Sequence, residues 1–81
     1  MDTGFKNNPL KFTVMIKSQI GKNAGQIWQY LDDNQVSSVF EIMKVLSMEK
    51  QDVLMALGWL ARENKIYFLG EKKDCKIMII Y

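Results

Sequence analysis

Hydrophobic residues recur at intervals of three and four in three stretches of this 81-residue chain, a spacing that puts them on one face of a helix. The first predicted helix has the stripe Ala24, Ile27, Trp28 and Leu31. The second has Val39, Ile42, Met43 and Leu46, and the third has Val53, Leu57, Leu60 and Ala61. The pattern therefore predicts three amphipathic helices between residues 19 and 64.

Residues that favour helix ends mark the boundaries. Asn34 and Asn64 are expected to end the first and third helices, because asparagine tolerates the left-handed conformation. Ser38 and Glu41 have the spacing of a capping box, so the second helix begins there. Residues 35–37 leave room only for a short strand between these helices.

Two starting points for the third helix remain open, Ser47 and Glu49. Gly58 lies in the middle of this helix, where glycine costs about 1 kcal/mol relative to alanine. The close approach of another backbone would explain it.

The chain finishes with two apolar runs of strand type. Residues 66–69 lead into the polar turn 70–74, and residues 76–81 return, which predicts a hairpin. The last run is apolar on both faces, with Ile77, Ile79 and Tyr81 on one side and Met78 and Ile80 on the other.

The N-terminus gives a weaker pattern. Residues 1–9 are polar and contain the only proline, which predicts a flexible start. Residues 10–16 alternate between apolar and polar positions, which favours a strand; the alternative is an early start of the first helix. We therefore divide the chain into an N-terminal arm, 1–18, and one domain, 19–81.

Composition excludes several classes of protein. The chain has no His and one Cys, and 48% of its residues are hydrophobic, without a run long enough to span a membrane. These counts predict a cytoplasmic protein that is not an enzyme and has no metal or cofactor. Cys75, beside the lysines of the turn, is interpreted as an inert surface thiol rather than a redox sensor.

The order helix, short strand, helix, tight turn, helix, hairpin predicts a mainly α fold with a small β-hairpin, the winged helix-turn-helix. Residues 20–28 (IGKNAGQIW) and 56–63 (ALGWLARE) resemble a family of small bacterial winged helix-turn-helix domains of unknown function. The resemblance covers residues 19–81 and implies binding of double-stranded DNA. Where such domains usually carry glycine, this chain has Ser47 between the second and third helices and Asn64 after the third.

In that mode of binding, the third helix enters the major groove and the hairpin contacts phosphates. The predicted nucleic-acid-binding residues are Lys50, Gln51, Met55, Lys72, Lys73 and Lys76. Arg62 is a further outward position on the helix, and Lys17 and Lys22 could add backbone contacts. The formal net charge is +2, but the third helix with its flanks, residues 47–64, carries −1.

Several large apolar residues have no place in the predicted core. Because a domain this small buries little surface, we expect a symmetric homodimer. The predicted dimer interface consists of Trp59, Ile77, Ile79 and Tyr81. The alternative function is a protein-interaction module that does not bind DNA. It is favoured by the acidic third helix and by the apolar Met55, Trp59 and Tyr81, which we expect to be exposed.

Overall fold

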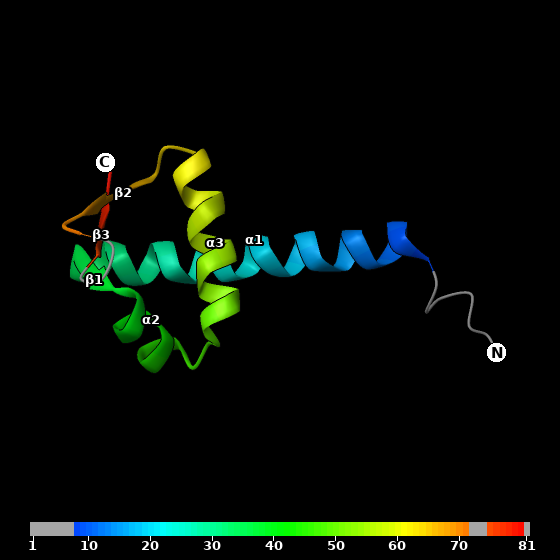
Figure 1. Ribbon diagram of the computed structural model, residues 1–81, viewed down its shortest axis with the longest axis horizontal. Coiled ribbons are helices and arrows are strands. Elements are labelled where there is room, and N and C mark those ends of the chain that lie inside the picture. The colour runs from blue at the N-terminus through cyan, green and yellow to red at the C-terminus, as the bar shows by residue number, and fades with distance from the viewer. Residues whose placement is uncertain (1–7, 72–74, 81) are drawn as a thin grey trace.

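The computed structural model describes residues 8–71 and 75–80 and contains three helices and three strands (Figure 1). The helices are α1 (Pro9–Asn34), α2 (Val39–Leu46) and α3 (Lys50–Arg62). The strands are β1 (Val36–Ser38), β2 (Ile66–Leu69) and β3 (Lys76–Ile79). This is the predicted mainly α chain with a small antiparallel sheet.

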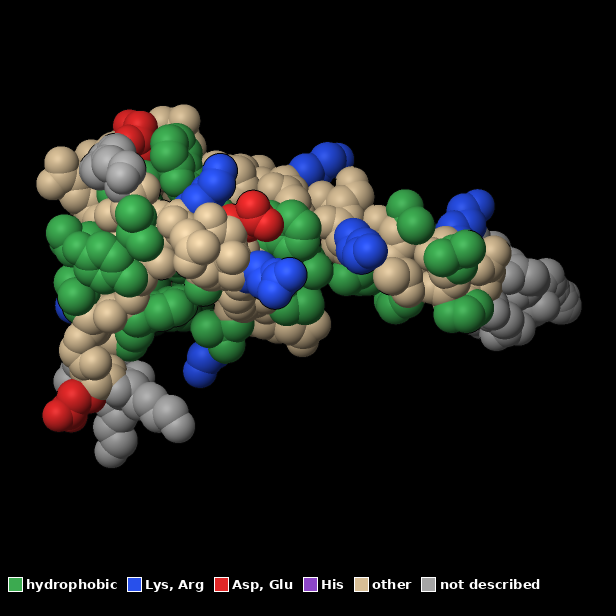
Figure 2. Space-filling model, turned by 90° about the horizontal axis from the view of Figure 1, so that it is seen from above, with side chains coloured by type: hydrophobic (Ala, Val, Ile, Leu, Met, Phe, Trp, Pro, Cys, Tyr) green, Lys and Arg blue, Asp and Glu red, His purple; other side chains and the backbone are tan. Residues whose placement is uncertain are grey.

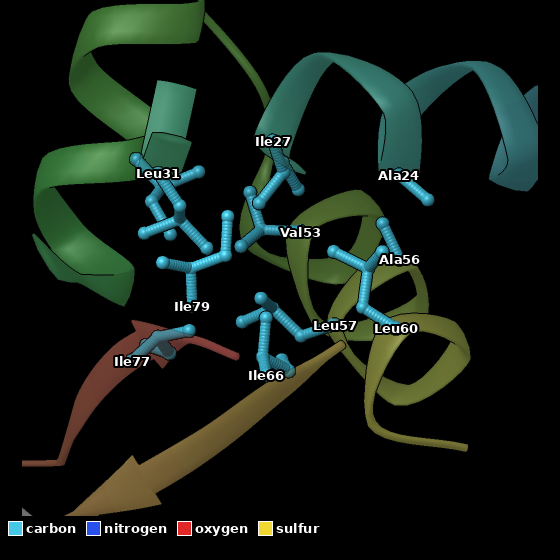
Figure 3. Close-up of a cluster of buried hydrophobic side chains, with 11 residues drawn as sticks. Ala24, Ile27, Leu31, Val53, Ala56, Leu57, Leu60, Ile66, Ile77 and Ile79 are labelled. Carbon is cyan, nitrogen blue, oxygen red and sulfur yellow. The ribbon is translucent and has the colours of Figure 1, made fainter. Parts of the chain in front are cut away.

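The core lies where the C-terminal half of α1 crosses α3 above the sheet (Figure 3). From α1, Ala24, Ile27 and Leu31 are all buried, as the periodicity predicted. The other buried apolar side chains are Ile42, Val53, Ala56, Leu57, Leu60, Ile66, Ile77 and Ile79. Burying a large apolar side chain stabilises the fold by about 1.5–3 kcal/mol, so this cluster holds the elements together.

The sheet has the strand order β1-β3-β2, with both pairs antiparallel. The last strand is therefore central, and it is flanked by β1 at Val36↔Met78 and by β2 at Tyr67↔Met78. A central strand needs apolar residues toward the core, and this explains the high apolar content of residues 76–80.

The strand expected over residues 10–16 is wrong, because α1 already begins at Pro9. The side chain of Asn8 caps the helix by accepting a hydrogen bond from the backbone N–H of Lys11 at 3.1 Å. Proline suits the first helical position for two reasons. Its fixed φ is close to the helical value, and it lacks the backbone N–H that would have no acceptor within the helix at this position. The flexible start predicted over residues 1–9 otherwise lies outside the described residues.

Each helix ends close to a non-glycine residue with positive φ. These residues are Gln35 (70°), Ser47 (54°) and Asn64 (60°). Asn34 is the last residue of α1, so the left-handed stop falls one position later than predicted. Ser47 and Asn64 have the positive φ that glycine adopts without strain, and Glu49 is the N-cap of α3.

A capping box starts α2, as predicted. The N–H of Glu41 donates to Ser38 Oγ, and the N–H of Ser38 donates to Glu41 Oε1, both at 3.1 Å. The buried Ser37 hydroxyl lies 3.3 Å from the same carboxylate oxygen and 3.3 Å from the Tyr30 hydroxyl. This polar chain joins α1, β1 and α2.

We predict that acid weakens this junction. The N–H of Ser38, the Ser37 hydroxyl and the charge of Lys76 hold the pKa of Glu41 below its ordinary value of 4.5. A lowered pKa stabilises the fold above the unfolded-state value, and that contribution is lost as the pH falls through the folded-state value. The free energy of unfolding should therefore decrease below about pH 4.5 less in Glu41→Gln than in the parent protein.

Urea denaturation at neutral and acidic pH, followed by circular dichroism, measures this difference. Glu49→Gln is the matched control, because Glu49 starts a helix without any cap hydrogen bond from its side chain. An equal loss of stability in the parent protein and in Glu41→Gln would contradict the prediction.

Candidate nucleic-acid interface

The outward face of α3 carries a stripe of four residues at helical spacing. Val53, Ala56, Leu57 and Leu60 fix the buried side of this helix. The opposite side therefore presents Gln51, Met55, Gly58 and Arg62 over three turns, and all four are exposed. The predicted positions Gln51 and Met55 thus lie together on one surface, with Lys50 exposed at its N-terminal end.

Gly58 belongs to this outward stripe, which corrects the expectation of a backbone packed against it. A Cβ built at Gly58 meets no atom within 4 Å. The fold of the single chain therefore does not require glycine there. The space above Gly58 is open to whatever binds α3 from outside.

Charges around α3 have mixed sign. Lys50 and Arg62 are exposed, but so are Glu49 and Glu63, and Asp52 is half-buried on the first turn. Together these five residues give −1 for residues 47–64, but α3 itself, without the flanking Glu49 and Glu63, carries +1. The charges surround a partly apolar centre. The helix therefore has few positively charged side chains that could contact phosphate, and it has some polar side chains that could contact base edges.

The hairpin contributes one described lysine. Lys76 is exposed, starts β3, and pairs with Ser38 on β1 and with Leu69 on β2. Its charge acts on Glu41 at the start of α2. Lys72 and Lys73 lie outside the described residues.

Two of the four predicted interface residues are not on the surface. Ile77 is 0% exposed and Ile79 is 4% exposed, because β3 is central and both side chains point into the core of the single chain. Trp59 is 49% exposed at the C-terminal part of α3 and remains available to a partner. Tyr81 lies outside the described residues.

Two other apolar surfaces were not predicted from the sequence. Val36, Met78 and Tyr67 are register partners in one row across the outer face of the sheet, and Val36 and Tyr67 are exposed. The second surface is the N-terminal part of α1, for which the sequence favoured a strand and left an early start of the helix open. The pair Asn8-Pro9, a helix-start signal, would have indicated it.

The three helices, the tight turn between α2 and α3 and the β2–β3 hairpin define a winged helix-turn-helix domain. The chain belongs to the DUF2582 family of winged helix-turn-helix domains, whose profile matches residues 15–80. This agrees with the resemblance seen in the sequence.

Two relatives support the assignment. The chain is 41% identical over 64 residues to the uncharacterized protein MJ1608 of Methanocaldococcus jannaschii, covering 75% of this chain and 90% of that protein. It is also similar to the solution NMR structure of protein BT2368 from Bacteroides thetaiotaomicron, with a TM-score of 0.71 and 30% identity. That match covers 78% of this chain and 77% of the other.

The described residues show few features of other kinds of site. The described residues contain no group of three or more Cys, Asp or Glu side chains arranged to hold a metal ion. Within the same residues, no helix combines the length and the apolar character needed to cross a membrane. Cys75 is half-buried, and its thiol lies 3.7 Å from the carbonyl oxygen of Lys76.

We predict that Gly58→Ala stabilises the folded chain. Alanine favours a helix interior by about 1 kcal/mol over glycine, and its methyl group meets no neighbour here. Thermal or urea unfolding measures the gain. Gly70→Ala is the matched control: Gly70 has a φ of 88°, so the same change there should destabilise the chain. A loss of stability in Gly58→Ala would contradict the prediction.

Proposed function

We propose that this protein binds double-stranded DNA as a homodimer and acts as a transcriptional regulator in the cytoplasm. The proposal assigns no enzymatic activity to the chain. Two observations support the proposal. The chain belongs to a winged helix-turn-helix family, and in the helix-turn-helix mode of binding one helix enters the major groove. In this chain that helix would be α3, with its outward stripe toward the DNA.

The observation that carries the proposal is the outward stripe of α3. Gln51 is at the N-terminal part of the helix, where the first turns meet base edges in this mode of binding. Its amide can pair with adenine through two hydrogen bonds, and Lys50 can donate to guanine. Met55 offers an apolar contact, and Gly58 allows the DNA to approach the helix closely.

Phosphate contacts come from other elements in this proposal. Lys76, with Lys72 and Lys73 of the same hairpin, contacts the backbone as the wing. Lys17 and Lys22 of α1, both exposed, would add contacts to the backbone. Such contacts position the protein without reading sequence.

A second candidate function is a protein-interaction module that binds no DNA. The observation that favours it is the mixed charge of α3 combined with the exposure of Leu54, Met55 and Trp59, which are 47%, 36% and 49% exposed. Carboxylates at the start of a recognition helix repel phosphate, whereas apolar side chains of this size suit a protein partner.

The test is fluorescence anisotropy with random and genomic duplexes over a salt series. Each phosphate contact contributes about −0.9 to the slope of log affinity against log salt, so Lys76→Ala should reduce the slope by about that amount. Gln51→Ala should keep the slope and change the ranking of duplex sequences.

Lys11→Ala, at the far end of α1, is the matched control and should leave the slope unchanged. Absence of binding to any duplex at low salt would overturn DNA binding. In that case, capture of a specific heterologous protein that Met55→Ala or Trp59→Ala weakens would support the second candidate.

A further inference from the structure

The N-terminal part of α1 projects from the body of the molecule. All residues from Asn8 to Gln19 are exposed, and burial in α1 begins only at Ile20 (Figure 1). The helix is about 39 Å long at 1.5 Å per residue, whereas the molecule measures 22 Å across. We call residues 9–19 the projecting segment.

The projecting segment is strongly apolar for an exposed helix. Five of its side chains, between 37% and 73% exposed, are Leu10, Phe12, Val14, Met15 and Ile16. Figure 2 shows hydrophobic side chains on several sides of it. A helix with apolar residues on several sides is normally covered, and none of the other residues that the structure describes covers this one.

A groove lies further along the same helix. Gly21, Gly25 and Trp28 of α1 line one side of it, and Trp59 and Leu60 of α3 line the other. The charged Glu63 and Lys65, which follow α3, also belong to its wall. A Cβ built at Gly21 or at Gly25 meets no atom within 4 Å, so the floor of the groove is bare helix backbone. The groove therefore has room for the side chains of another helix.

The segment and the groove lie on one face of α1. Leu10, Val14, Gly21, Gly25 and Trp28 fall within about 60° of one another around the helix axis. Leu10 and Gly25 are symmetric about the peptide between Lys17 and Ser18, and so are Val14 and Gly21. In an antiparallel pair centred there, each large side chain of one copy lies opposite a glycine of the other.

We propose that a second copy of this chain occupies the groove. The projecting segment of each copy lies antiparallel along α1 of the other, with Leu10 over Gly25 and Val14 over Gly21. The contact is the same in both directions, as a two-fold dimer requires. This proposal rests on the homodimer of the proposed function and is independent of DNA binding.

The area of contact favours this face. Overlap from residue 10 to residue 25 covers about 24 Å of helix in each copy and also includes the exposed Trp59, and a stable interface needs a long contact because it buries about 1,000 Å² or more in total. The face of Phe12 and Ile16 continues the stripe of Ile27, where α3 of the same chain already lies. Overlap there would be limited to residues 9–20, about 18 Å of helix.

Sedimentation velocity over a concentration series tests the proposal. The parent chain should dimerise, and Val14→Glu should weaken the dimer on the order of 100-fold, because it buries two carboxylates in an apolar contact. Met15→Glu is the matched control. Met15 has a similar exposed fraction, 50% against 58%, but its side chain points away from the groove face, so the dimer should persist.

Exchanging the small and the large residue of one proposed contact tests the register of the two helices. Gly25→Leu should break the dimer by colliding with Leu10 of the second copy, and Leu10→Ala combined with Gly25→Leu should restore it. Gln26→Leu, which adds leucine on the other side of α1, is the control. Circular dichroism and unfolding of each variant establish that the monomer remains folded.

Intrinsic fluorescence provides a local readout. Both tryptophans of the chain, Trp28 and Trp59, line the groove, so occupation should shift the emission to shorter wavelength as concentration rises. The proposal is overturned by a monomeric parent chain, by equal dimerisation of Val14→Glu and Met15→Glu, or by a dimer that forms without the shift. DNA binding is measured separately, so its failure would leave this result unaffected.

Discussion

The packing of α1 against α3 is the contact on which the rest of the fold depends. Ile27 and Leu31 of α1 belong to one buried cluster with Val53 and Leu57 of α3, and the buried side chains of β2 and β3 complete this cluster. Without this crossing, neither the sheet nor α2 has an apolar surface to cover. The crossing also fixes which side of α3 faces outward, because a helix with one buried stripe exposes the opposite one.

The same crossing explains the shape of the molecule. Only the C-terminal half of α1 takes part in it, so the residues of the other half are exposed. The buried core lies entirely outside the projecting segment, whose apolar side chains remain on the surface of the single chain. The structure thus separates a packed body from an exposed helix surface, and the proposed dimer rests on that surface.

Local signals in the sequence predicted several elements well, and the physical reasons are clear. The capping box of Ser38 and Glu41 acts within four residues, so its hydrogen bonds form as the spacing predicts. The stripe on each helix also depends only on helical periodicity. Residues 10–16 left two interpretations open, because four alternating apolar positions suit a strand, whereas the apolar Met15 suits an early start of the first helix. The structure confirms the helix, which Asn8 and Pro9 start.

Some features required the tertiary structure. The alternation of Ile77 and Ile79 identifies a strand, but only the strand order shows that this strand is central and that both side chains are buried inside one chain. Likewise, the sequence shows Gly21 and Gly25 only as small residues. The structure shows that they form the floor of a groove, because Trp59 of α3 lines the same groove. The sequence by itself determined the buried stripes of the three helices, the capping box and the hairpin, because these depend on neighbours along the chain. The tertiary structure decided which apolar residues remain exposed, because burial depends on neighbours in space.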